Sequence, residues 1–342
     1  MNHVTISLKD VAVRAGVSSG TVSNVLNRPD RVKAATVERV NRAIAELGYV
    51  PNAAARQLRA GQSTSLGLIV LDVGNPFFTD LAKGAERAAA DVGLSVLLAN
   101  SDESSEREDR YLDLFETQRV AGVLISPVSE DLPRLHRLRA RGIPVVLVDR
   151  GATDSDFPSV SVDDVAGGRI ATEHLLAIGR TKIAFVGGPL RIRQVADRYR
   201  GACDAVEAAG RGSVEYIETS ALTLAAGQVA GTRIGKGVRD GRFDAVFAAN
   251  DLVALGVQQA LLGGPEPLTI PGDVALVGYD DISFAAAAVV PVSSVRQPRE
   301  LIGSTAVELL LANAGDASEN EQVVFQPELV VRDSTKARGA SI

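Results

Sequence analysis

Cysteine and long apolar runs are what this chain of 342 residues has least of. Its single cysteine, Cys203, excludes an internal disulfide, so a reducing compartment is allowed and a buried thiol is expected. No stretch approaches the roughly 20 apolar residues of a membrane helix, and the polar start MNHVTISLKD lacks the apolar run of a signal peptide. We therefore expect a cytoplasmic protein with no membrane partner.

Groups that could carry out catalysis are also scarce. The three histidines are His3 in an N-terminal tail and His136 and His174 in helical stretches, and no serine or cysteine nucleophile motif surrounds them. The glycine motifs GGP and GKG fit neither known phosphate-loop pattern. We predict no catalytic residue, no metal and no cofactor; carboxylates at strand ends leave a sugar-processing enzyme as an alternative.

Positive charge is concentrated at one end of the chain. The net charge is −6, yet the first 62 residues hold nine lysines and arginines against four acidic residues, a charge of +5, so the remainder carries −11. A basic head on an acidic body favours binding of a phosphate backbone at one end only.

Residues 8–27, LKDVAVRAGVSSGTVSNVLN, predict two short helices joined by a glycine turn. Ser7 can cap the first helix with Asp10 as its capping-box partner, Gly16 can end it, and Ser18 can cap the second. A third helix, stopped by Gly48, places apolar residues on one face, namely Val37, Val40, Ile44 and Leu47. This pattern is typical of an all-α helix-turn-helix head.

The second helix carries small polar side chains that suit phosphate and base-edge contacts. We expect DNA contacts from Ser18, Ser19, Gly20, Thr21, Ser23, Asn24 and Asn27. Asn24 could pair with adenine through two hydrogen bonds. A helix cap is the competing interpretation of Ser18, and for Ser19 both interpretations stay open.

Several segments resemble the LacI/GalR (lactose-repressor/galactose-repressor) family: DVAVRAGVSSGTVSNVLN, YVPNAAARQLRAGQS, NPFF at 75–78, ND at 250–251 and GYDD at 278–281. The resemblance spans nearly the whole chain. It implies a bacterial, nucleoid-associated transcriptional regulator, a repressor above all, that binds a palindromic operator in double-stranded DNA as a homodimer. Relative to common members, Gly20 replaces a larger side chain and Asn24 replaces a frequent arginine, so a different operator is expected.

The segment 51–63 is predicted to be a hinge. AAARQLRAG, from Ala53, contains helix formers but is too short to be stable alone. In the family two such helices pair in the minor groove, where a leucine, here Leu58, wedges between base pairs. The resemblance therefore adds four predicted DNA contacts: Tyr49, Asn52, Arg56 and Leu58. An ordinary linker is the alternative.

From residue 64 onward short apolar runs alternate with helical patterns, which is typical of βαβ units in parallel sheets, and the low aromatic content of 4% agrees. Strands are predicted from Leu66, Leu94, Gly122 and Pro144, and again from Lys182, Glu215, Asp244 and Val274. Predicted helices lie near 77–92, 105–118, 131–140, 164–178, 194–209, 223–237 and 251–262.

By resemblance these units form two doubly wound parallel-sheet lobes of the type I periplasmic-binding-protein kind. The predicted domains are a head at 1–50, a hinge at 51–63, and an effector-binding and dimerisation body at 64–342. Within the body, lobe 1 covers about 64–162 and 294–325, and lobe 2 about 163–293 and 326–335. The helix at 298–313 is expected in lobe 1 and ELVVRD, from Glu328, in lobe 2.

Polar residues at strand ends are expected to line a cleft between the lobes and to bind a sugar or polyol effector. The predicted effector contacts are Asn75, Phe77, Phe78, Asp149, Arg150, Asp163, Gln194, Arg198, Leu222, Asn250 and Asp280. Arg150 could instead form a surface ion pair, and Phe157 could also supply a stacking face. Leu222 stands where many members have an aromatic platform, which disfavours purines, as do Ile192 and Gln194.

The predicted mechanism is a two-state dimer in which closure of the lobes on an effector changes whether the paired hinges fold on DNA. The sign of the effect stays open. Two other regulators remain alternatives: an architectural DNA-binding protein whose body only dimerises, and the same fold controlled by a protein corepressor. The tail after Arg332 has no leucine heptads, so a tetramer is not expected.

Overall fold

The computed structural model describes residues 6–49, 63–129, 132–151, 156–313 and 321–336. By internal contacts the chain divides into two units, Met1–Gln62 and Ser63–Ile342. We describe each unit by itself.

The N-terminal unit contains the three predicted helices, α1 (Leu8–Ala15), α2 (Ser19–Asn27) and α3 (Ala34–Leu47), with a 3-10 turn at Pro29–Arg31. Ser7 and Asp10 form the predicted capping box, and the Thr21 N–H donates to Ser18 Oγ. Gly16 and Gly48 end α1 and α3 in the left-handed region, at φ 63° and 62°. Apolar residues from all three helices close one core: Val11, Ala12, Ala15, Val22, Val25, Val40 and Ala43.

The first lobe of the body is built on a six-stranded sheet in the order β11-β5-β4-β3-β1-β2, with every neighbouring pair parallel. Its strands are β1 (Ser65–Val70), β2 (Ser95–Asn100), β3 (Gly122–Ile125), β4 (Val145–Val148), β5 (Ser159–Val162) and β11 (Gln322–Phe325). Alternate side chains pack on opposite faces. Helices α5 (Pro76–Asp91) and α13 (Arg299–Ala312) cover one face, and α6 (Ser105–Gln118) and α7 (Pro133–Ala140) the other.

The second lobe repeats this plan in the order β12-β10-β9-β8-β6-β7, parallel except that β12 runs antiparallel to β10. Its strands are β6 (Lys182–Gly187), β7 (Ser213–Glu218), β8 (Ala245–Ala248), β9 (Ala275–Asp280), β10 (Ser293–Arg296) and β12 (Glu328–Val330). Helices α10 (Leu224–Arg239) and α11 (Asp251–Gly263) cover one face, and α8 (Asp164–Ala177) and α9 (Arg193–Ala209) the other. A short α12 (Ser283–Ala286) follows β9.

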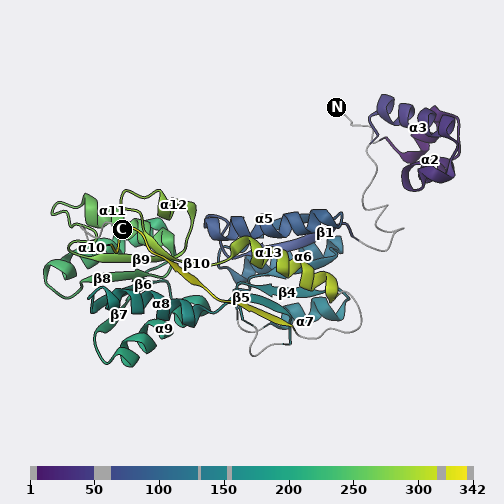
Figure 1. The fold of residues 1–342 in the computed structure, drawn as a ribbon. Helices are drawn as coiled ribbons and strands as arrows, with labels where there is room; N and C mark the ends of the chain where they lie inside the picture. Colours follow the sequence, from purple (N-terminus) through teal and green to yellow (C-terminus); the bar gives the residue numbers. More distant parts are fainter. Residues whose placement is uncertain (1–5, 50–62, 130–131, 152–155, 314–320, 337–342) are drawn as a thin grey trace. The chain divides into compact units, whose positions relative to one another are not determined.

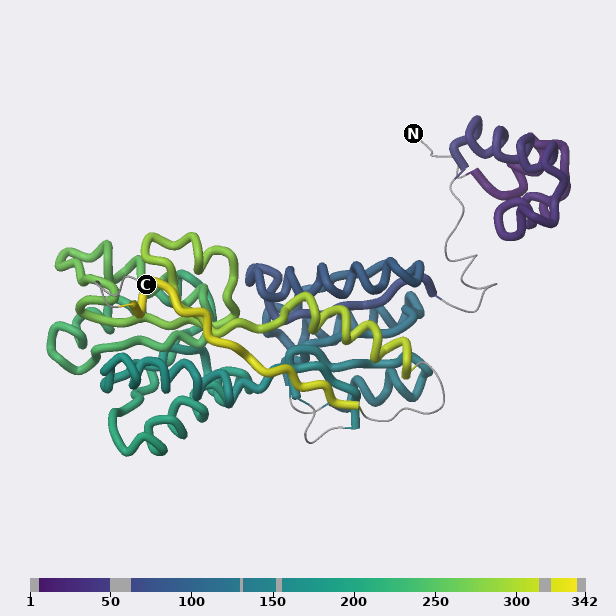
Figure 2. Tube along the Cα trace, in the orientation of Figure 1, coloured from purple at the N-terminus to yellow at the C-terminus, as the bar shows by residue number. Residues whose placement is uncertain are grey.

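The chain passes between the lobes three times: from β5 to α8, from β10 to α13 and from β11 to β12 (Figures 1 and 2). As predicted, α13 packs in the first lobe, against α5, and the strand from Glu328 joins the second. The second crossing lies after Arg296 rather than at 293/294, because all of β10 pairs with β9. The crossing strands β5, β10 and β11 are four residues long each and were not predicted as strands.

Close helix packing positions one residue of the site. Gly168 on α8 and Gly201 on α9 face each other's helices, and a Cβ on either would overlap a backbone oxygen, of Arg198 and Val165 respectively. Only glycine permits this approach, and it brings Arg198 on α9 within reach of Asp164 on α8.

Other residues weighed from the sequence take structural places. Cys203 is half-buried on α9, rather than fully buried as expected. His136 packs against Phe157 with the two rings tilted by 45°, and His174 shares a hydrogen bond of 2.8 Å with Thr335. His3 lies outside the described residues. None of the described helices has the length and apolar character needed to cross a bilayer.

Candidate functional site

A cavity of about 190 Å³ lies between the two lobes of the body. The lobe 1 side is formed by segments that follow β1, β2 and β4, and the lobe 2 side by segments that follow β6, β7, β8 and β9. The cavity therefore sits at the carboxyl ends of both sheets, where open α/β sheets place their ligands. Nine of the predicted effector contacts line it: Asn75, Phe77, Phe78, Asp149, Gln194, Arg198, Leu222, Asn250 and Asp280.

Backbone strain is concentrated around this cavity. Asp102, Glu103 and Asp149 have φ between 52° and 57°, and Asp280 has φ 99°. All four line the cavity. A non-glycine residue in the left-handed region costs about 1–2 kcal/mol, and such residues gather at functional sites.

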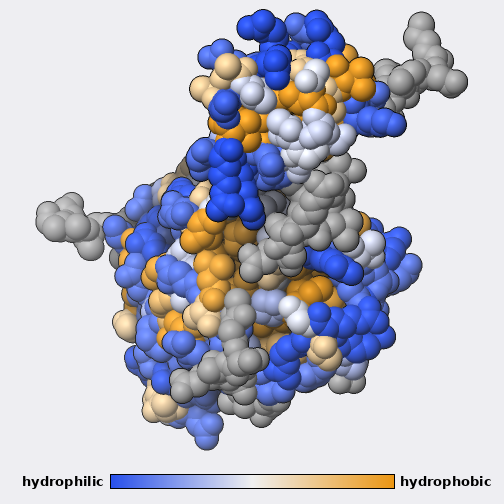
Figure 3. Space-filling model, turned by 90° about the vertical axis from the view of Figure 1, so that its right-hand side faces the viewer, coloured by the Kyte–Doolittle hydropathy of each residue, from blue (hydrophilic) through white to orange (hydrophobic). Residues whose placement is uncertain are grey.

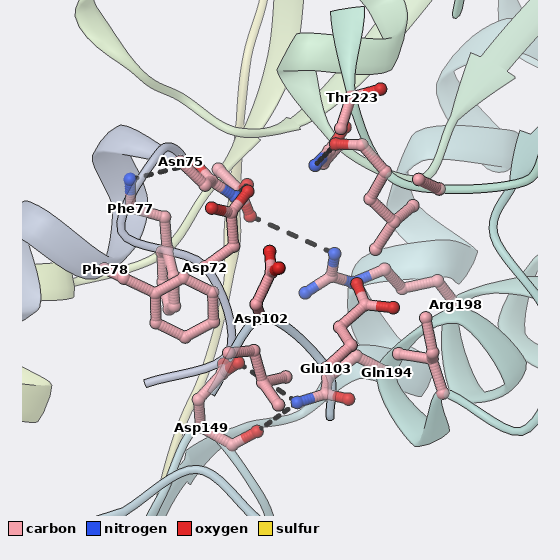
Figure 4. A pocket seen from close by; sticks show the side chains of 16 residues that line it. Asp72, Asn75, Phe77, Phe78, Asp102, Glu103, Asp149, Gln194, Arg198 and Thr223 are labelled. Atoms are coloured by element: carbon pink, nitrogen blue, oxygen red, sulfur yellow. Dashed lines mark hydrogen bonds and ion pairs between the residues drawn. The ribbon is translucent and has the colours of Figure 1, made fainter. Parts of the chain in front are cut away.

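Arg198 is the central cation of the site. Its Nε donates to Asp164 Oδ1 at 2.8 Å, and its Nη1 donates to the Ala249 carbonyl at 2.7 Å and lies 3.9 Å from Asp280 Oδ1. The guanidinium also lies over the Tyr279 ring, 3.7 Å from the centroid. Burial disfavours the charged form of Arg198, but Asp164 and its other neighbours outweigh burial, so the pKa is raised. The guanidinium is permanently charged and points into the cavity (Figure 4).

Two hydrogen-bonded pairs join the lobes across the cavity. Asn75 caps α5 through its Oδ1, and its Nδ2 donates to Asp280 Oδ2 at 3.1 Å. Gln194 Nε2 donates to the Asp149 carbonyl at 2.7 Å and to its Oδ2 at 3.0 Å (Figure 4). The two lobes are thus held together by polar side chains that a ligand could also bind.

Burial sets the protonation of the acidic residues here. It raises the pKa of Asp149 well above 3.8, and the carboxylate of Asp164 adds to the shift, while Arg198 opposes it. Burial also raises the pKa of Asp280, against the opposing effect of Arg198. Burial therefore makes both carboxyl groups readier to take up a proton than an exposed aspartate is.

The remaining predicted residues have other surroundings. Asp163 does not line the cavity: it caps α8, its Oδ1 accepting from the Ala166 N–H at 2.9 Å. Arg150 lines a smaller adjoining cavity and donates to the Ser129 carbonyl. Asn250 lines the main cavity, yet its amide donates to the Leu222 carbonyl and its Oδ1 caps α11. Phe157 is buried in the lobe 1 core.

Phe77 and Phe78 are both core residues and cavity walls, in an edge-to-face pair with centroids 5.0 Å apart. They supply the apolar face of the cavity (Figure 4).

Three acidic residues of the cavity were missed in the sequence. Asp72 follows β1, and Asp102 and Glu103 follow β2. All three lie within three residues of the end of a strand, and position after a strand is the signal that identified Asp149. Figure 4 shows the Asp102 and Glu103 side chains pointing into the space that Arg198 enters. Carboxylates facing a guanidinium provide acceptors and donors for a hydroxylated ligand.

The second candidate site is the exposed side of α2. Val22 and Val25 are buried, whereas Ser19, Gly20, Asn24 and Asn27 are exposed. Ser18 Oγ is held by Thr21, and Asn27 Nδ2 donates to the Ser23 carbonyl at 2.8 Å. Ser19 and Asn24 are left as exposed polar side chains of α2. Every lysine and arginine from residue 6 to 49 is exposed.

Tyr49 packs partly against the core of the N-terminal unit. Asn52, Arg56 and Leu58, the other predicted hinge contacts, lie outside the described residues.

Family comparisons match almost the whole chain. A model described as "Bacterial regulatory proteins, lacI family" matches residues 7–52. A second, "Periplasmic binding proteins and sugar binding domain of LacI family", matches residues 63–328.

Individual relatives are similar over their full length. The ribose operon repressor of Escherichia coli (strain K12) is 32% identical over 96% of this chain and 99% of its own. A solved complex of the transcriptional regulator CelR with cellobiose is 33% identical, with a TM-score of 0.70, over 96% of this chain and 99% of its own. A solved lac repressor dimer, bound to operator and the anti-inducer ONPF, is 28% identical, with a TM-score of 0.82, over 97% of this chain and 99% of its own.

Proposed function

The chain belongs to the LacI family of bacterial regulatory proteins, and we propose that it represses transcription under the control of a sugar or polyol bound between its lobes. The relatives are regulators that bind DNA, so the sugar-processing enzyme is no longer an alternative. We propose that the protein acts in the cytoplasm, on the nucleoid.

The domain roles we propose follow the predicted boundaries. Residues 1–50 read DNA, 51–63 form the hinge, and 64–342 bind the effector and dimerise. In the head, Ser19 and Asn24 are the side chains best placed to reach base edges, because both are exposed and neither caps its helix. Thr21, Ser23, Asn27 and Ser18 then contact phosphates or orient α2. Asn24 recognises adenine through two hydrogen bonds to the edge of the base.

Gly20 supports direct reading by α2. It lies within the helix without a left-handed φ, and the nearest atom to an added Cβ would be Ser18 Oγ at 3.6 Å, an ordinary contact. The fold therefore does not need glycine there. We propose that glycine is present because it has no side chain, so the backbone of α2 can come close to the DNA.

We propose a two-fold dimer that places two heads on an inverted repeat. The lac repressor relative is a dimer on its operator. In this chain β2 is an edge strand of the first sheet, and Leu98 on it is 47% exposed. The space-filling view shows apolar residues exposed among hydrophilic ones on the face it presents (Figure 3). An unpaired apolar edge of this kind is a surface that a second copy would cover.

The observation that carries the effector role is the cavity itself. Strained acidic residues, a buried guanidinium and two hydrogen-bonded pairs that join the lobes lie around one cavity. A ligand that binds there interacts with both lobes at once and shifts their relative position, and with it the hinges. The CelR relative holds cellobiose.

Selection from random double-stranded DNA tests this proposal. The full-length protein is incubated with a random library, and bound fragments are sequenced over several rounds. Enrichment of one inverted repeat is expected. Recovery of fragments with no shared inverted repeat would contradict the proposal. A thermal-shift screen with sugars and polyols tests the effector, since ligand at 100 times its Kd adds about 2.7 kcal/mol of stability.

A further inference from the structure

The cleft between the lobes consists of two adjoining compartments. The main cavity measures about 190 Å³ and a smaller one about 40 Å³. Both are lined by Leu71, Glu103, Ile192 and Gln194. Shared walls make them parts of one space, so a single ligand can occupy both.

The two compartments differ in charge. In the part of the chain that the structure describes, the main cavity is lined by five acidic residues, Asp72, Asp102, Glu103, Asp149 and Asp280, and by one basic residue, Arg198. That arginine is already paired with Asp164. Among the residues that the structure describes, the smaller compartment is lined by three arginines, Arg150, Arg191 and Arg193, and by one carboxylate, that of Glu103. The main cavity repels anions, and the smaller compartment attracts them.

Arg191 and Arg193 of the smaller compartment are weakly compensated, whereas Arg150 donates to the Ser129 carbonyl and its charge acts on Glu108. Among the described residues, Arg191 forms no hydrogen bond or ion pair, although its charge acts on Glu103. Arg193 Nε lies 3.6 Å from Asp197 Oδ2, a loose pair. Helix α9 begins here, and its N-cap residue, Ile192, makes no side-chain cap hydrogen bond, so the positive end of α9 adds to the field.

The arginines also come from both lobes. Arg150 follows β4 in lobe 1, whereas Arg191 and Arg193 lie between β6 and α9 in lobe 2. An anion among these arginines contacts both lobes and so holds them together.

We propose that the effector is a hydroxylated ring that carries an anionic group, a carboxylate or a phosphate. The ring occupies the main cavity, against Phe77, Phe78 and Arg198, and the anionic group lies among Arg150, Arg191 and Arg193. This inference rests on the proposed function, because it names the chemistry of the effector for the same cleft. Charge-assisted hydrogen bonds to one or two arginines favour the acid over its neutral parent by about 10-fold to 100-fold.

Matched ligand pairs test the inference by calorimetry on the full-length protein. The pairs are glucose with glucuronate, galactose with galacturonate, and glucose and fructose with their phosphates, each at low and at physiological salt. The expected result is that one acid binds at least about ten times more tightly than its neutral parent, with an advantage that shrinks as salt rises. The uronate and phosphate arms distinguish the two anionic groups.

Variants locate the effect. The double substitution Arg191→Gln/Arg193→Gln is expected to reduce the preference to less than about two-fold while the neutral sugar binds as before. Arg200→Gln is the matched control, because Arg200 lies on the same helix, pairs with Asp197 and lines neither compartment. It should leave the preference unchanged.

Two results would overturn the inference. If neutral sugars bind as tightly as their acids, the arginines do not select the effector, and the sugar-controlled repressor still stands. If no member of the panel binds, both the inference and the sugar part of the proposed function fail.

Discussion

Replacement of Arg198 by methionine tests how the site is held together. Methionine keeps most of the side-chain volume but removes the guanidinium that pairs with Asp164 at 2.8 Å and with the Ala249 carbonyl at 2.7 Å. Removing one partner of a buried ion pair costs about 3–5 kcal/mol, because the other charge is left buried and uncompensated. Asp164 would be left so, whereas Asp280 keeps its hydrogen bonds from Asn75 and Gln297. We expect Arg198→Met to lower the free energy of unfolding of the body by about 4 kcal/mol.

The assay is thermal unfolding followed by circular dichroism. At about 2 °C per kcal/mol, Tm should fall by about 8 °C at pH 7. Burial raises the pKa of Asp164 and Asp280, so both protonate more readily in the folded protein than in the unfolded one. Without the guanidinium the loss is therefore largest at neutral pH and shrinks as pH falls toward 3.8.

Two further variants make the result specific. Arg198→Met/Asp164→Asn should recover more than half of the lost stability, since the uncompensated charge of Asp164 is gone. Arg200→Met, in which a 62% exposed side chain loses its pair with Asp197, should cost less than about 1 kcal/mol. A Tm for Arg198→Met equal to that of the unsubstituted protein would refute the role of Arg198 as the charge that balances this site.

Three other perturbations have defined outcomes. Asp149→Asn should stabilise the body at pH 7, because burial, together with Asp164, raises the pKa of Asp149. An aspartate with a raised pKa makes the folded state lose stability as pH rises from 3.8 through the folded pKa, and asparagine avoids this loss. Denaturant titrations should therefore show a gain that vanishes near pH 3.8, and a gain independent of pH would contradict this assignment. Gly20→Ala should stabilise α2 by about 0.5–1 kcal/mol yet weaken operator binding, as measured by melting and fluorescence anisotropy; unchanged binding would argue against close approach of α2 to DNA. Leu58→Ala should weaken binding to the selected operator far more than to random DNA in the same anisotropy assay, and equal losses would rule out wedging.

The elements with a regular hydrophobic pattern were predicted from the sequence. Short strands, and polar side chains that form hydrogen bonds within their own lobe, were not predicted correctly. Long apolar strands such as β1 and β9 and capped helices such as α1 follow from period and cap residues alone. Strands β5 and β10 were not predicted, because four residues with serines among them resemble a loop until a neighbouring strand pairs with them. Strand β11, also four residues long, was missed as well. They matter because the crossings between lobes run through them.

The same limit applies to the site. Asp149 was identified by its position after a strand, whereas Arg198 was identified by resemblance. The same positional rule, applied to β1 and β2, would have found Asp72 and Asp102 as well. The hydrogen-bond partner of a polar side chain is harder to predict. Asp163 looked like a ligand contact but satisfies the first turn of α8 instead, and the Asn250 amide is taken up by the Leu222 carbonyl. Which acceptor a polar group finds depends on tertiary contacts that no local pattern encodes.

Coupling between the cleft and the head is the central claim, and one titration tests it directly. The dissociation constant for the selected inverted repeat is measured by anisotropy with and without the ligand that the calorimetric panel identifies. The account predicts a change of about 5-fold to 150-fold in either direction, and an equal reciprocal effect of the operator on ligand affinity. Identical operator affinity at zero and saturating ligand would contradict it.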